Sequence, residues 1–121
     1  MQESGEMYLE TILVIGKEKN SVRAIDIVER IGFSKPAVSR ALTRLKTDGC
    51  ILVDASGFIA LTEKGHSIAE KIYERHRVLT DMLITLGVDP VTASADACKM
   101  EHDISDVTFE AIKNHLSRIK N

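Results

Sequence analysis

The sequence predicts a mainly α-helical chain with one short β-hairpin after its third helix. Apolar residues recur every three or four positions along most of the 121 residues, which is the period of an amphipathic helix. The period changes only over residues 50–61, where two short β-prone runs flank a polar turn. The expected order is therefore three helices, the hairpin and three further helices.

Apolar spacing and end signals predict the first two helices. The first spans residues 6–17 with Ser4 as its N-cap, and the second spans residues 23–31. Gly32 follows the second helix and is a common residue at a helix C-terminus. The residues expected to face inward are Leu9, Ile12, Leu13, Ile15, Ala24, Ile27, Val28 and Ile31.

A third helix and the hairpin follow. Ser34 caps the helix, and Pro36 occupies its first turn, where a missing N–H has no cost. The strands are expected at residues 50–53 and 58–61, joined by residues 54–57. The buried stripe of the third helix is expected at Val38, Leu42 and Leu45.

Three helices are expected beyond the hairpin. Thr62 opens a long helix that ends near Leu86, a fifth helix follows Pro90, and Ser105 or Asp106 caps the sixth. Their apolar stripes are, in chain order, Ile68, Ile72, His76, Leu79, Leu83 and Leu86, then Val91, Ala95, Cys98 and His102, then Phe109, Ile112, Leu116 and Ile119.

Residues 1–62 have the element order of a winged helix-turn-helix, whose second motif helix enters the DNA major groove. Residues 17–49 hold eight basic and four acidic residues, although the net charge of the chain is −2. This basic segment coincides with the motif and favours DNA as a partner over a solvated surface or a protein-contact motif. The candidate DNA-contacting residues are Ser34, Lys35, Pro36, Ser39, Arg40, Thr43 and Arg44.

Cys98, Glu101 and His102 form a candidate metal-binding cluster in the expected fifth helix. Residues three and four apart share a helix face, so thiol, carboxylate and imidazole converge, and all three bind divalent transition metals. The alternative is a packing cysteine beside a common Glu-His pair. His76 favours the metal site because an imidazole within an apolar stripe needs a partner, although a backbone carbonyl would also serve.

Other classes of function lack a signature. The sequence has no His-Glu-x-x-His motif, no glycine-rich phosphate loop and no recognisable Ser/His/Asp spacing, so an enzyme is not expected. A catalytic pair formed by Cys98 and His102 is the one conceivable exception. No apolar run approaches the about 20 residues of a membrane span, and the N-terminus lacks signal-peptide features, so a cytoplasmic location is expected. The two cysteines lie in different contexts, which argues against a disulfide, and Cys50 is expected to be a buried packing residue.

Six segments follow one family's local patterns in order and spacing. They lie at residues 6–12, 34–39, 61–65, 74–79, 87–89 and 98–105. On these segments the chain resembles the diphtheria toxin repressor family of metal-dependent transcriptional regulators, which includes a manganese-responsive branch. It is similar to a short form of the family that lacks the extra C-terminal domain of longer members.

The resemblance implies a set of metal ligands. Sulfur atoms stand at Met7 and Cys98, as in iron-responsive members, where manganese-responsive members carry oxygen ligands. Thr80 and Ser94 stand at two positions of the longer members' accessory site, so a complete site of that type is not expected. Without the resemblance, Met7 would be a core residue. Glu10 and His76 match ligands of the manganese branch. Together with Glu101 they are the candidates for holding a second ion. The full set of expected ligands is Met7, Glu10, His76, Cys98, Glu101 and His102.

The resemblance also implies a function. It indicates a homodimer held together by a helical region at residues 63–121, bound to palindromic double-stranded operator DNA and controlling metal-ion uptake and homeostasis. Fe2+ is the expected activating ion and Mn2+ the alternative, while Zn2+ or Co2+ can bind tightly in vitro. The rival interpretation is a winged-helix regulator that does not depend on metal.

Overall fold

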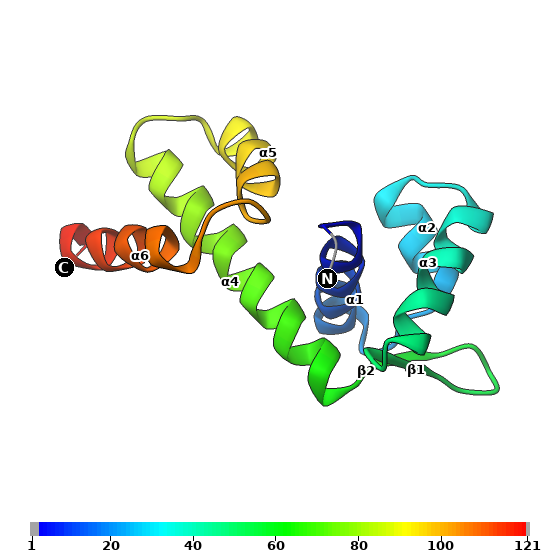
Figure 1. Cartoon of the computed structure of the whole chain (residues 1–121). Coiled ribbons are helices and arrows are strands. Elements are labelled where there is room, and N and C mark those ends of the chain that lie inside the picture. The colour runs from blue at the N-terminus through cyan, green and yellow to red at the C-terminus, as the bar shows by residue number, and fades with distance from the viewer. Residues whose placement is uncertain (1–2, 121) are drawn as a thin grey trace. The chain divides into compact units, whose positions relative to one another are not determined.

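Six α-helices and one two-stranded sheet make up residues 3–120, the part of the chain that the computed structural model describes (Figure 1). The elements are α1 (Glu3–Lys19), α2 (Ala24–Ile31), α3 (Lys35–Thr47), β1 (Ile51–Val53), β2 (Ile59–Leu61), α4 (Glu63–Thr85), α5 (Pro90–Met100) and α6 (Asp106–Lys120). This order confirms the expected mainly α-helical fold. The chain forms two compact units that meet between Glu70 and Lys71, inside α4. A functional boundary after residue 62 stays a prediction.

α1 supplies much of the apolar core of the N-terminal unit. Leu9, Ile12 and Ile15 are almost fully buried, and the helix contacts α2, α3 and β2. The predicted N-cap at Ser4 is wrong, because α1 begins at Glu3 and Ser4 lies within its first turn. No residue at the start of this helix forbids helical backbone angles, so the helix begins before the polar residue that could have capped it.

α2 and α3 form the helix-turn-helix. The N–H of Arg23 donates to Asp26 Oδ2 at 2.9 Å and closes the first turn of α2. Gly32 ends α2 with a φ of 84°, the left-handed conformation that glycine adopts without strain. Ile27 is buried as predicted, whereas Ala24 is exposed because it begins the helix on the solvent side.

α3 is capped and packed as its sequence predicts. The Ser34 hydroxyl accepts the N–H of Ala37 at 3.2 Å, and Pro36 lies in the first turn. The buried stripe consists of Val38, Leu42 and Leu45. Because α3 packs against the core through this one face, its opposite face is exposed to solvent.

β1 and β2 pair antiparallel over three residues each and form the predicted hairpin. Each strand is one residue shorter than expected: β1 begins at Ile51 instead of residue 50, and β2 begins at Ile59 instead of residue 58, on the side of the turn. The Asp54 carboxylate accepts the N–H groups of Ser56 and Phe58, each at 2.9 Å, and so turns the chain before the second strand begins. Cys50, just before β1, is fully buried, which confirms its role in packing.

The first turn of α4 packs tightly against the chain that leads into β1. The Thr62 hydroxyl accepts the N–H of Gly65 at 3.1 Å, which confirms the predicted cap, and donates to the carbonyl of Gly49 at 2.7 Å. A Cβ atom at Gly65 would lie 2.0 Å from the carbonyl oxygen of Cys50. Only glycine therefore allows this close approach of two backbone segments.

The C-terminal unit has a small apolar core between α4 and α6. Two residues of the predicted apolar stripes lie outside this core: Leu86 is 71% exposed and Ile119 is 49% exposed. Both lie at or beyond the end of their helix, where no other element of the unit covers them. The buried members of the two stripes are Ile72, Leu79, Phe109 and Leu116.

The buried face of α5 differs from the prediction. The sequence places Val91 at the start of an inward stripe, but it is 82% exposed, and Ala95 and Cys98 are exposed as well. Ala93 and Ala97 are the fully buried residues. Alanine adds little to an apolar pattern, so these two positions do not stand out in the sequence.

Candidate metal centre and DNA-reading helix

Three side chains with metal-binding atoms converge in the C-terminal unit: His76 on α4, Cys98 on α5 and Glu101 directly after α5. One ligand atom of each lies within 4.8 Å of the others. His76 Nδ1 lies 2.9 Å from Glu101 Oε2 and 3.9 Å from Cys98 Sγ. Imidazole nitrogen, thiolate sulfur and carboxylate oxygen form a donor set typical of Zn2+, Fe2+ and related ions. The residues present therefore fit a divalent transition-metal ion.

The Glu101 carboxylate lies between two imidazoles. Its side chain is 1% exposed, and its second oxygen lies 3.5 Å from Nε2 of His102, which is itself 5% exposed. A buried carboxylate requires hydrogen bonds or a compensating positive charge. Protonated imidazoles or a bound cation would meet this requirement, so His102 lies beside the cluster in a position consistent with its predicted role.

Arg75 holds the segment that follows α5. Its Nη1 donates to the carbonyl oxygens of Glu101 at 3.1 Å and Ile104 at 2.7 Å, and its Nη2 pairs with the carboxylate of Asp106. Lys71, and then Arg75, hold the pKa of the Asp106 carboxyl below its usual value. Sequence reasoning missed Arg75, because its partners lie 26 to 31 residues away and leave no local pattern.

Two predicted ligands lie outside the helix in which they were expected. α5 ends at Met100, so Glu101 is its C-cap and His102 lies in the following turn. Arg75 occupies the Glu101 carbonyl, which would otherwise accept an N–H one turn further along a continuing helix. The ligands therefore converge through a turn rather than through helical spacing.

Two hydroxyl groups lie on the elements that carry the cluster. Ser94 Oγ lies 3.3 Å from His76 Nε2, and Thr80 Oγ1 is buried with no hydrogen-bond partner among residues 3–120. A neutral hydroxyl is a weaker metal ligand than a carboxylate or an imidazole. A second ion, held by Glu10, His76 and Glu101, stays a prediction.

Met7 and Glu10, the remaining predicted ligands, lie on α1 in the N-terminal unit. Both are partly buried, and their spacing of three residues places them on one face of the helix. Their participation in the cluster stays a prediction.

The outward face of α3 carries the predicted DNA-contacting residues. All of them are exposed, including Ser34, whose hydroxyl also caps the helix. Within the described part of the chain, Lys35, Arg40 and Arg44 form no ion pair, so their charges are available to a polyanion.

Comparison with known proteins identifies both units. The iron-dependent repressor N-terminal DNA-binding domain matches residues 1–56, and the iron-dependent repressor metal-binding and dimerisation domain matches residues 62–121. The transcriptional regulator MntR of Escherichia coli O6:H1 is 36% identical over 106 residues, covering 88% of this chain and 68% of MntR. The iron-dependent repressor IdeR of Mycobacterium tuberculosis H37Rv is 31% identical over 120 residues, covering 98% of this chain and 50% of IdeR.

Solved structures agree with these relatives. The structure of the manganese regulator SloR superimposes with a TM-score of 0.83 at 28% identity, covering 93% of this chain and 53% of that one. A winged helix followed by metal-binding helices defines a DNA-binding protein that responds to metal. The chain belongs to the iron-dependent repressor family of metal-dependent transcriptional repressors. It spans about half the length of IdeR and of the SloR chain.

Proposed function

We propose that this chain represses transcription as a cytoplasmic homodimer that binds palindromic operator DNA when a divalent metal ion is bound, and that it controls metal-ion uptake and homeostasis. The convergence of His76, Cys98 and Glu101 within 4.8 Å, in a chain that also has an exposed basic recognition helix, carries this proposal. Among residues 3–120, no helix is both long and apolar enough to span a membrane. Cys98 and His102 act as ligands, not as a catalytic pair.

The proposed mechanism links the metal to the recognition helix through α1. His76, Cys98, Glu101 and His102 hold the ion, and Met7 and Glu10 complete its ligand set. The ion supplies positive charge to the buried carboxylate and the thiolate. Because α1 contacts both α2 and α3, holding α1 in place also holds the DNA-contacting helix in place. Metal therefore shifts the population toward the DNA-competent state to the extent that the ion binds this state more tightly than the state that does not bind DNA.

Metal dependence is tested by DNA binding to the chain's own promoter region with and without a chelator. We expect the metal-loaded protein to protect a palindromic site and the chelated protein to lose it. Equal protection under both conditions would instead support the rival, a winged-helix regulator without metal control.

Fe2+ is the proposed activating ion, with Mn2+ the alternative. Sulfur ligands at Met7 and Cys98 suit Fe2+ and later metals better than Mn2+. Glu10 and His76 favour manganese, and the relatives include both iron and manganese regulators.

Replacing Met7 with Asp and Cys98 with Glu together should shift the preference from Fe2+ toward Mn2+, because hard oxygens replace soft sulfurs. Promoter binding titrated with each ion under anaerobic conditions measures this preference. If the parent chain already prefers Mn2+ and the double variant behaves alike, the sulfur atoms do not set metal choice.

Arg40 should contribute directly to operator recognition. It is exposed on the outward face of α3 beside Ser39. Arg40→Ala should weaken binding to the operator by ~1–3 kcal/mol, as expected for a bidentate contact to a base. Fluorescence anisotropy with operator and scrambled duplexes checks this. Equal weakening on both duplexes would make Arg40 a phosphate contact, and unchanged affinity would remove it from the interface.

Dimerisation should involve the helices beyond Leu61. The C-terminal unit exposes several large apolar side chains, and the recognition helix must remain free for DNA. These side chains are Leu86, Val91, Val107 and Ile119. We expect light scattering to give twice the chain mass at micromolar concentration. A monomer both with and without metal would contradict this.

A further inference from the structure

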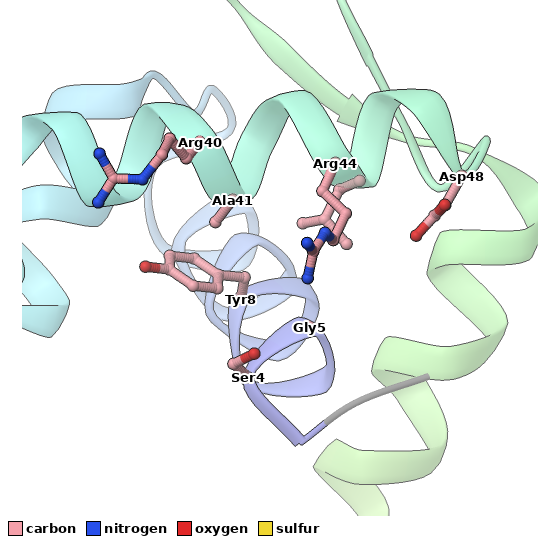
Figure 2. Close-up of a pocket in the computed structure, with 8 residues that line it drawn as sticks. Ser4, Gly5, Tyr8, Arg40, Ala41, Arg44 and Asp48 are labelled. Atoms are coloured by element: carbon pink, nitrogen blue, oxygen red, sulfur yellow. The ribbon is translucent and has the colours of Figure 1, made fainter.

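A cavity of about 540 Å³ lies between α1 and α3 in the N-terminal unit (Figure 2). Ser4 and Tyr8 of α1 line one side, and Arg40 and Arg44 of α3 line the other. None of the cluster residues His76, Cys98 and Glu101 lines this cavity. The cavity lies beside the recognition helix α3.

The α3 side of the cavity carries uncompensated positive charge. Arg40 and Arg44 are one helical turn apart, and both are exposed. Neither forms an ion pair with any of the side chains that the structure describes, at residues 4–120. Two guanidinium groups without carboxylate partners attract an oxyanion, for which their planar N–H arrangement is well suited.

The α1 side offers a neutral hydrogen-bond donor. Tyr8 is 4% exposed, and its ring packs edge-on against Phe33 with centroids 6.4 Å apart. Its hydroxyl lines the cavity and has no hydrogen-bond partner among the described residues. Figure 2 shows the hydroxyl on the side of the cavity where Arg40 lies. The ring is buried, whereas the hydroxyl is open to the cavity and can donate a hydrogen bond to a ligand there.

Asp48 restricts where an anion can lie. It lines the opposite end of the cavity, beyond Arg44, as Figure 2 shows. Its carboxylate repels a negative ligand from that end. The favourable position is therefore bounded by Tyr8, Arg40 and Arg44.

We propose that this cavity binds one phosphate group of the operator DNA backbone, held by the Tyr8 hydroxyl and by the guanidinium groups of Arg40 and Arg44. The inference rests on the proposed function, in which the outward face of α3 meets DNA. It makes α1 a DNA-contacting element in its own right. Tyr8 lies directly after Met7, so a metal that holds α1 would also hold a phosphate ligand in place.

Two substitutions test the site by different signatures. Tyr8→Phe keeps the packed ring and removes only the hydroxyl, so operator affinity should fall about tenfold with no change in its salt dependence. Arg44→Gln removes a charge, so affinity should fall and the slope of log affinity against log salt should decrease by about one. Tyr73→Phe in the C-terminal unit is the matched control and should leave affinity unchanged. Equal thermal midpoints for all four proteins confirm that each is folded.

Operators with single neutral methylphosphonates identify the phosphate. At one position, the methylphosphonate should weaken operator binding by the parent protein. It should cause no further weakening for Arg44→Gln or Tyr8→Phe, because these variants have already lost the contact. If Tyr8→Phe binds the operator as tightly as the parent protein does, the phosphate site is overturned and the proposed function remains intact. A parent that binds no operator with any metal overturns both. Saturable binding of inorganic phosphate that Tyr8→Phe abolishes, without any methylphosphonate coupling, would assign the cavity to a free anion and overturn the DNA assignment.

Discussion

Glu101→Gln should abolish metal-activated DNA binding, with metal affinity reduced by more than the roughly 10–100-fold that loss of an outer-shell partner causes. Glutamine has nearly the same shape, but it cannot supply a negative charge to the ion. Glu101 lies within 4.8 Å of both His76 and Cys98 and is 1% exposed, so the substitution removes the buried carboxylate of the cluster. Competition with a chelating dye measures the affinity, and promoter binding measures the consequence.

Glu74→Gln is the matched control for this change. Glu74 lies in the same unit and pairs with Lys113 at 3.0 Å, and its side chain is 40% exposed, in contrast to that of Glu101. We expect the metal affinity and the DNA binding of the Glu74→Gln variant to equal those of the parent protein. If Glu101→Gln also retains parental metal affinity, the cluster around His76 is not the metal site.

Gly65→Ala should destabilise the N-terminal unit by about 3 kcal/mol or more, because the new Cβ collides with backbone that cannot rotate away. The Cβ would lie 2.0 Å from the carbonyl oxygen and 2.9 Å from the carbonyl carbon of Cys50. Either the turn of α4 capped by Thr62 or the start of the hairpin must shift. Denaturant titration should show an earlier midpoint.

Gly16→Ala provides a control of opposite sign. Gly16 also lies within a helix, but the nearest atom to a methyl group at this position would be Val22 Cγ2 at 3.8 Å, an ordinary contact. Alanine is the better helix former, so stability should rise by about 0.5–1 kcal/mol. Equal effects of the two substitutions would mean that the approach of Gly65 to Cys50 is not tight in solution.

Local signals were sufficient to predict the helix-turn-helix. Ser34 caps α3, Gly32 ends α2, and Val38 belongs to a stripe that a single helix period defines. These features depend on neighbours within a few residues, so the sequence alone expresses them. Ser4 shows the limit of such signals, because a residue able to cap a helix does not prevent it from starting earlier.

The candidate metal site was only partly predictable. Cys98 and Glu101 are brought together as expected, but through a turn that depends on Arg75. The face of α5 was misassigned because two sets of residues share the same spacing. Val91 appeared to begin a stripe, whereas the buried residues are alanines, which add little to an apolar pattern.

In the proposed function, metal and operator DNA stabilise the same state of the protein. Such coupling must be reciprocal, so each ligand raises the affinity of the other by one common factor. The most direct test is to measure Fe2+ and Mn2+ affinity, under anaerobic conditions, with the protein alone and with the protein bound to operator DNA. We expect the activating ion to bind about 5–150-fold more tightly to the DNA complex, matching the gain in DNA affinity caused by that ion. Equal metal affinity in the two states would contradict metal-dependent repression through this site.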